Sequence, residues 1–171
     1  TKAVLGDNRI TDLLVYGNEQ FAVVNSNRIA KIINGELVAV PTPKDAHEQL
    51  EVKLQIVNDQ LYLIRGSKIY KYVNQQWKLF FHQKVDQNKQ VISDLVAINN
   101  ALFAVISPTN KLVNIITGET LDLQRLLYFS DFKTLNGKLY FSSAKGLYVL
   151  EERAGKYYKS YIYKDEEVVK F

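Results

Sequence analysis

The sequence contains no cysteine and no methionine, and it has only 3 prolines and 1 tryptophan in 171 residues. Without cysteine, neither a disulfide bond nor a thiolate metal site can form. Long apolar runs are also missing, because no stretch approaches the roughly 18 consecutive apolar residues of a membrane-spanning helix. We therefore expect no membrane insertion, and a cytoplasmic, periplasmic or secreted location is equally allowed. Since the chain begins at Thr1, we expect its start to have been processed or trimmed.

Motifs for catalysis and cofactor binding are absent too. No phosphate-binding loop, dinucleotide fingerprint, nucleophile elbow or zinc-binding histidine pair occurs, so we assign no catalytic residue, no metal and no cofactor. His47 and His82 lack a third ligand at metal-site spacing, which favours surface or edge positions for both. The 22 basic and 18 acidic residues are scattered and give a net charge of +4, which is not typical of a nucleic-acid-binding protein.

What the sequence does contain is an internal repeat. An asparagine recurs at spacings of 40, 41 and 37 residues, and a large apolar residue follows it three positions later. The asparagines are Asn18, Asn58, Asn99 and Asn136, and the apolar residues are Phe21, Leu61, Leu102 and Leu139. We expect these four apolar side chains to occupy one buried position in four repeat units.

Three turn signals in each unit predict four strands per unit. The first turn holds the asparagine, and the last turns are Asn34-Gly35, Asn74-Gln75, Thr117-Gly118 and Ala154-Gly155. Asn, Asp and Gly tolerate the positive φ of tight hairpins, so their recurrence has a physical cause. Segments such as 21–24 and 61–64 are apolar at every position, which indicates sheets buried on both faces. We therefore expect about sixteen strands and little helix.

A four-stranded meander repeated about every 40 residues is typical of a β-propeller blade. The run from Asn58 to Tyr62, followed by Lys68-Ile69-Tyr70, resembles generic bacterial propeller repeats of the two-component-regulator and quinoprotein-like kind. The resemblance covers about residues 9–164. It implies an all-β fold, a small β-propeller of four four-stranded antiparallel blades, with a β-sandwich as the alternative. We expect a single domain over residues 1–171, with units at about 9–50, 51–90, 91–128 and 129–164.

A ring of four blades must protect its open edges. We favour a monomer in which residues 1–5 or 167–171 pair into a terminal blade, because both segments carry apolar residues suited to a short strand. The alternative is a symmetric dimer that joins two open chains edge to edge.

Acidic residues recur at one place in three units. Asp12, Asp94 and Asp131 each follow a hydroxyl residue and open the first strand of their unit, and Lys53 takes this place in the second unit. If the first strands line a central channel, these side chains form a weak candidate site for a ligand or cation. The structural interpretation, which we favour, is that each Asp accepts backbone N–H hydrogen bonds at a blade junction.

Aromatic residues gather in two predicted outer strands. Trp77, Leu79 and Phe81 alternate along one strand and are expected on one core face. The weak candidates for a partner site are the lysine-interleaved tyrosines of the other strand, Tyr157, Tyr158, Tyr161 and Tyr163.

Three functions compete. The first is a non-enzymatic binding module, in which a propeller face or edge recognises another protein. The second is a carbohydrate- or small-ligand-binding propeller, which would repeat one aromatic residue in every unit. The third is a hydrolase or lyase that uses acidic residues at the channel mouth. The sequence favours the first, largely by analogy of fold.

Overall fold

A computed structural model describes residues 9–43, 51–84, 90–109, 111–123, 129–143 and 146–164. Within these ranges the chain forms sixteen β-strands and no helix, as the turn pattern predicts. His47 and the terminal segments 1–5 and 167–171 lie outside the described residues. The chain divides into two compact units, Thr1–Asn88 and Lys89–Phe171. Each unit holds two of the four predicted repeats, and the single domain over residues 1–171 stays a prediction.

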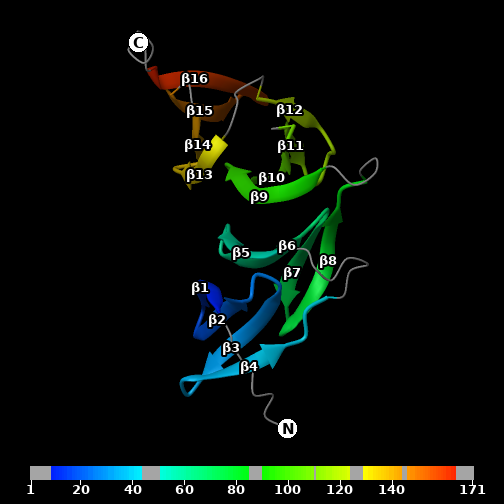
Figure 1. The fold of residues 1–171 in the computed structure, drawn as a ribbon. Coiled ribbons are helices and arrows are strands. Elements are labelled where there is room, and N and C mark those ends of the chain that lie inside the picture. Colours follow the sequence, from blue (N-terminus) through cyan, green and yellow to red (C-terminus); the bar gives the residue numbers. More distant parts are fainter. Residues whose placement is uncertain are drawn as a thin grey trace. The chain divides into compact units, whose positions relative to one another are not determined.

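The first unit contains two antiparallel four-stranded sheets. The first sheet has β1 (Ile10–Tyr16), β2 (Glu19–Val24), β3 (Arg28–Ile33) and β4 (Glu36–Val40) in that order. The second sheet has β5 (Val52–Val57), β6 (Gln60–Arg65), β7 (Lys68–Val73) and β8 (Gln76–His82) in that order. Each sheet is therefore a meander, in which every strand pairs with its neighbours in sequence (Figure 1).

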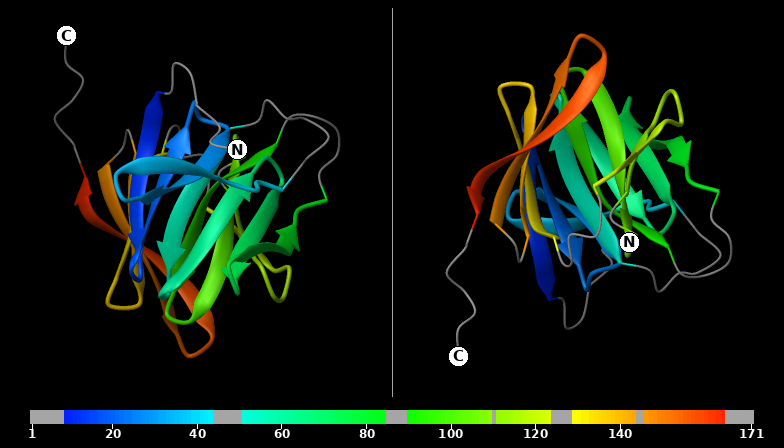
Figure 2. Two further views of the ribbon diagram at one scale, coloured as in Figure 1. Left: turned by 90° about the horizontal axis from the view of Figure 1, so that it is seen from below. Right: turned by 90° about the horizontal axis from the view of Figure 1, so that it is seen from above.

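The second unit repeats this construction. Its first sheet has β9 (Val91–Ile98), β10 (Ala101–Ser107), β11 (Lys111–Asn114) and β12 (Thr120–Asp122). Its second sheet has β13 (Phe129–Leu135), β14 (Lys138–Ser143), β15 (Gly146–Arg153) and β16 (Lys156–Lys164). The β15–β16 hairpin, orange to red in Figure 2, extends beyond the yellow β13–β14 hairpin.

Each unit has a core between its two sheets. In the first unit, β2 contributes Phe21 and Val23, which pack against Leu61 and Leu63 of β6 and their neighbours. In the second unit, Phe103 and Val105 of β10 pack with Leu139 and Phe141 of β14 and their neighbours. Alternate residues of a strand point to opposite faces, so a side chain from every second position enters these cores.

The predicted buried positions are confirmed, with one correction of register. Phe21, Leu61 and Leu139 are fully buried, and Leu102 is 9% exposed. However, the first hairpin loop of the first sheet is Gly17-Asn18, whereas Asn58, Asn99 and Asn136 are the first of two loop residues in theirs. Gly17 has φ +58° and Asn58 has φ +48°, so a glycine takes the place of the asparagine in the first unit. Phe21 therefore lies one residue further from its loop than Leu61 does.

The expectation that Trp77, Leu79 and Phe81 share one core face is wrong. A β-bulge interrupts the pairing of β8, because Tyr70 pairs with Leu79 and Ile69 pairs with Phe81. Phe80 is the extra residue, and a bulge of this kind moves the following side chain to the other face. Phe81 is the side chain that the bulge moves to the other face. Trp77 packs against the core, whereas Leu79, which precedes the bulge on the face of Trp77, is 57% exposed.

Candidate functional site

The three aspartates of the sequence pattern occupy equivalent places in their sheets. In each case the pairing of the first strand skips one residue and resumes at the aspartate, opposite Val23 for Asp12, Val105 for Asp94 and Ser142 for Asp131. The skipped residues are Thr11, Ser93 and Ser130. The sequence pattern of a hydroxyl residue followed directly by Asp therefore coincides with a β-bulge at the start of the first strand.

Local hydrogen bonds explain why these residue types stand at the bulge. The Thr11 hydroxyl donates to the Val23 carbonyl at 3.3 Å, and the Ser93 hydroxyl donates to the Val105 carbonyl at 3.4 Å. The backbone N–H of Leu13 donates to Oδ1 of Asp12 at 2.8 Å. The N–H of Phe132 donates to Oδ1 of Asp131 at the same distance. The carboxylates of Asp12 and Asp131 thus each accept the backbone N–H of the residue that follows them.

Lys53 lies at the corresponding place in the second sheet. It pairs with Ile64 in a regular ladder with no bulge between β5 and β6. Val52 precedes it and has no hydroxyl to bridge a bulge. Among the described residues, no group of three or more His, Asp or Glu side chains could hold a metal ion. His82 is exposed at the end of β8.

The candidate tyrosines of β16 lie on two faces of their sheet. Tyr157 pairs with Glu152 and Tyr161 with Tyr148, so these two side chains share a face, whereas Tyr158 pairs with Glu151 and points the other way. Tyr158 is 46% exposed and lies beneath the Arg153 guanidinium, 5.9 Å from the ring centre. The side chain of Tyr163 lies outside the described part of the structure. The strand therefore offers no single tyrosine surface.

On the face of Tyr157 lies a groove between the outer strands of the second unit. Its volume is about 290 Å³, and it is partly open to solvent. It is lined by Thr120, Leu121, Asp122, Leu123, Leu150, Tyr157 and Lys159. Ligand sites in proteins usually have volumes of about 300–1,000 Å³, so this groove suits one or two rings rather than a large ligand.

The polar groups of the groove are held in place. The Lys159 ammonium donates to the Leu123 carbonyl at 3.0 Å and lies 5.9 Å from the centre of the Tyr148 ring. The Tyr157 ring meets Phe103 edge to face, with 5.4 Å between ring centres. Burial raises the pKa of Tyr157, and the nearby charges of Glu119 and Glu152 raise it further, so its phenol is neutral and able to donate a hydrogen bond.

The first unit shows why this groove is open. A bulge between Ile69 and Tyr70 matches one between Leu147 and Tyr148, which aligns β7–β8 with β15–β16. In this alignment Leu150 stands where Tyr72 stands. Lys159 stands where Trp77 stands.

In the first unit that space is filled by aromatic rings. The Trp77 ring lies 4.8 Å from the Tyr72 ring, and Tyr72 meets Phe21 edge to face at 5.4 Å. In the second unit β15 has 8 residues against 6 in β7, and the longer hairpin brings Tyr157 onto Phe103 instead. Tyr157 thus takes the role of Tyr72, while the place of the Trp77 ring becomes the groove.

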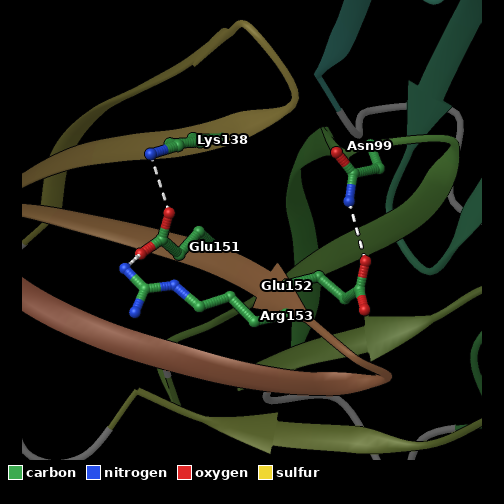
Figure 3. A network of polar contacts seen from close by, with 5 residues as sticks. All are labelled: Asn99, Lys138, Glu151, Glu152 and Arg153. Atoms are coloured by element: carbon green, nitrogen blue, oxygen red, sulfur yellow. Dashed lines mark hydrogen bonds and ion pairs between the residues drawn. The ribbon is translucent and has the colours of Figure 1, made fainter.

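A second polar cluster fixes the hairpin ends of the second unit. Lys138 and Arg153 both pair with the buried carboxylate of Glu151, with 2.7 Å between Lys138 and Glu151 (Figure 3). Lys138 and then Arg153 lower the pKa of Glu151 against the opposing effect of burial. The side-chain amide of Asn99 donates to Glu152 at 2.9 Å, which joins the β9–β10 loop to β15. The backbone N–H of Asn99 donates to the Gly137 carbonyl at 2.8 Å.

The sequence pattern names Tyr157 among the candidates for a partner site, but it does not single out Leu121, Leu150 or Lys159, which also line the groove. Lys159 is one of the lysines that interleave the tyrosines of β16. The signal that identifies the groove is the difference between equivalent residues of the second and fourth units, and it depends on aligning the bulges of β8 and β16.

No family model and no curated protein matches the sequence. Among solved structures, the chain is similar to the extracellular domain of a putative hybrid two-component system from B. thetaiotaomicron, with a TM-score of 0.60 and 14% identity. The match covers 90% of this chain but only 22% of that one. At this identity the likeness concerns the fold. The described residues include no helix long and apolar enough to cross a membrane.

Proposed function

We propose that this protein is a non-enzymatic binding module whose four sheets act as the blades of a small propeller and recognise a protein partner. The observation that carries the proposal is the similarity in fold to an extracellular domain of a two-component system, over 90% of the chain. The resemblance of the repeats to two-component-regulator propellers points the same way. By the same analogy, we propose a location outside the cytoplasm. The scattered charges, with a net value of +4, remain the reason to expect no nucleic-acid partner.

The meander sheets support the blade assignment. A propeller blade is a four-stranded antiparallel meander, and each of the four sheets has this strand order. Both faces of the central strands are buried: the four residues from Phe21 to Val24 and the four from Leu61 to Ile64 are almost inaccessible. Stacked blades require such strands, whereas a sheet with one solvated face would alternate.

The carbohydrate-binding alternative gains no such support. A lectin-like propeller would present one aromatic residue at equivalent places in its units. Trp77 instead corresponds to Lys159 in the alignment of bulges, and the carboxylates of Asp12 and Asp131 accept local backbone N–H groups.

Affinity capture with chemical cross-linking from cells of the source organism tests the proposal. We expect one protein to be enriched with the intact chain and not with a heat-unfolded sample of the same chain. Capture of a polysaccharide, or turnover of a substrate by the purified chain, would contradict a protein-binding module.

A further inference from the structure

We propose that the groove of the second unit receives an aromatic side chain, of the tryptophan or tyrosine type, presented by the partner protein. This inference rests on the proposed function and names the feature of the partner that is recognised. It starts from the internal comparison of the two units, because the first unit shows what fills the same space when the chain supplies its own occupant.

In the first unit the occupant is the indole of Trp77. Its ring lies tilted against the Tyr72 ring, with 4.8 Å between ring centres, and Trp77 and Val40 both pack against the core cluster of this unit. Val40 of β4 pairs with Ile29, and Leu121 of β12 pairs with Leu112. Ile29 and Leu112 in turn each pair with the residue that lies opposite the aspartate at the bulge of their sheet. Val40 therefore corresponds to Leu121. Leu121 thus takes the place of Val40, while Leu150 stands in the place of Tyr72 and Lys159 in the place of Trp77, so the second unit supplies no indole of its own here.

Charge complementarity favours an aromatic occupant over an aliphatic one. An ammonium group can meet the negative face of an aromatic ring, an interaction that an aliphatic side chain cannot make. In the groove, the Lys159 ammonium is held beside the space by the Leu123 carbonyl. A planar ring entering between Leu121 and Leu150 would meet this ammonium and the phenol of Tyr157.

A protein side chain suits the groove better than a free metabolite. The groove is shallow and is bounded on one side by β12, an edge strand of 3 residues. Such a site buries one anchor and leaves the remaining contacts to the surrounding surface. Tryptophan and tyrosine are the residues that most often anchor protein interfaces in this way.

The test is a titration of the whole ¹⁵N-labelled chain, observed by NMR, with the blocked tripeptide acetyl-Gly-Trp-Gly-amide. We expect shifts confined to amides of β12, β15 and β16, with a dissociation constant of about 1–10 mM, as for a fragment-sized ligand. The same tripeptide with cyclohexylalanine in place of tryptophan should bind about two- to fivefold more weakly, because its ring has no π-system. Equal binding of both peptides would overturn the aromatic assignment.

The matched variant fills the groove with a side chain of the protein itself. Lys159→Trp places an indole where Trp77 lies in the first unit, and we expect at least tenfold weaker tripeptide binding. Ser160→Trp adds the same ring to the opposite face of β16 and should leave binding unchanged. Should Lys159→Trp fail to fold, Leu150→Phe fills the groove from its floor. Undiminished binding to a folded, filled variant would contradict the inference.

Two further experiments distinguish failure of the groove assignment from failure of the proposed function. Free indole should bind no more tightly than the tripeptide, and the reverse order would contradict a protein side chain as the occupant. If the Lys159→Trp variant still captured the partner in the capture experiment, the result would support the protein-binding function but contradict the groove as the binding site. Tripeptide binding without any captured protein would contradict the proposed function while the aromatic site stands.

Discussion

At the scale of single residues, Gly137 is the position where a methyl group has the clearest cost. It has φ +73°, and a Cβ there would lie 2.3 Å from Oδ1 of Asn99. Gly137→Ala should cost about 2–3 kcal/mol in urea unfolding, from about 1–2 kcal/mol for the left-handed backbone and up to about 1.5 kcal/mol for a displaced Asn99. Gly155→Ala is the control, because Gly155 has φ +77°, is also the second residue of a two-residue hairpin loop, and has nothing within 4 Å of a Cβ placed there. Equal losses in both variants would show that the Asn99 contact adds no cost.

Glu151 makes stability depend on pH. Lys138 and then Arg153 lower its pKa in the folded state, so the folded carboxylate holds its proton more weakly than the unfolded one does. Its stabilising contribution is therefore complete above the ordinary value of 4.5 and is lost as the pH falls below that value through the lowered folded pKa. We expect the melting temperature of Glu151→Gln to fall less between pH 6 and acid than that of the unchanged chain. If the melting temperatures of the two proteins fell equally with pH, the ionisation of Glu151 would make no contribution to the pH dependence of stability.

The substitution Lys138→Met tests the cause of the lowered pKa. It should move the pKa of Glu151 back up in an NMR titration.

At the scale of the strand, substitution of the aspartates at the three β-bulges distinguishes a structural role of these residues from a cation site. An asparagine keeps the Oδ1 acceptor that Asp12 and Asp131 offer to the next amide. The triple change Asp12→Asn, Asp94→Asn and Asp131→Asn should therefore alter the free energy of unfolding by less than about 1 kcal/mol per site. Calcium or magnesium should not raise the melting temperature of the unchanged chain. A cation-dependent rise that the triple variant loses would establish a ligand site instead.

Burial on both faces makes β6 a strand that tolerates little change. Leu61 is fully buried in the core of the first unit, so Leu61→Ala should cost about 2–5 kcal/mol by removing contacts and leaving a cavity. Leu13 of β1 is 60% exposed, and Leu13→Ala should change stability by no more than about 0.5 kcal/mol. Similar effects of the two substitutions in urea unfolding would contradict the assigned faces.

At the scale of the whole molecule, the expected state is a monomer that contains almost no helix. Light scattering should give the chain mass of 19.7 kDa, and circular dichroism should show a β spectrum. The expectation of a monomer depends on the prediction that a terminal segment pairs with a blade, and residues 166–171 are the segment to delete. Their removal should lower the melting temperature, because an open sheet edge would be left. A particle of twice the chain mass that dissociates only on strong dilution would favour the dimeric ring instead.

Local chemistry determined much of the fold from sequence alone. Positive φ at Asn58, Asn74 and Asn136 is a property of the residue and its immediate neighbours, so the hairpins could be located without knowing what the strands contact. The same is true of the buried runs in β2 and β6, because a continuous apolar strand has no face to give to water. The recurrence of a hydroxyl residue before Asp marks three equivalent positions, but the pattern by itself does not predict a β-bulge there.

The groove and the faces of the outer strands were decided only by tertiary structure. Period-two alternation assigns faces correctly until one extra residue enters a strand, and Phe80 is such a residue in β8. Nothing local to Lys159 shows that it stands in the place of an indole, because that equivalence depends on matching bulges in strands far apart in the sequence. Sequence therefore determined where the chain turns and which segments are buried. Packing between sheets decided which position stayed empty, because a cavity depends on the side chains of several strands together.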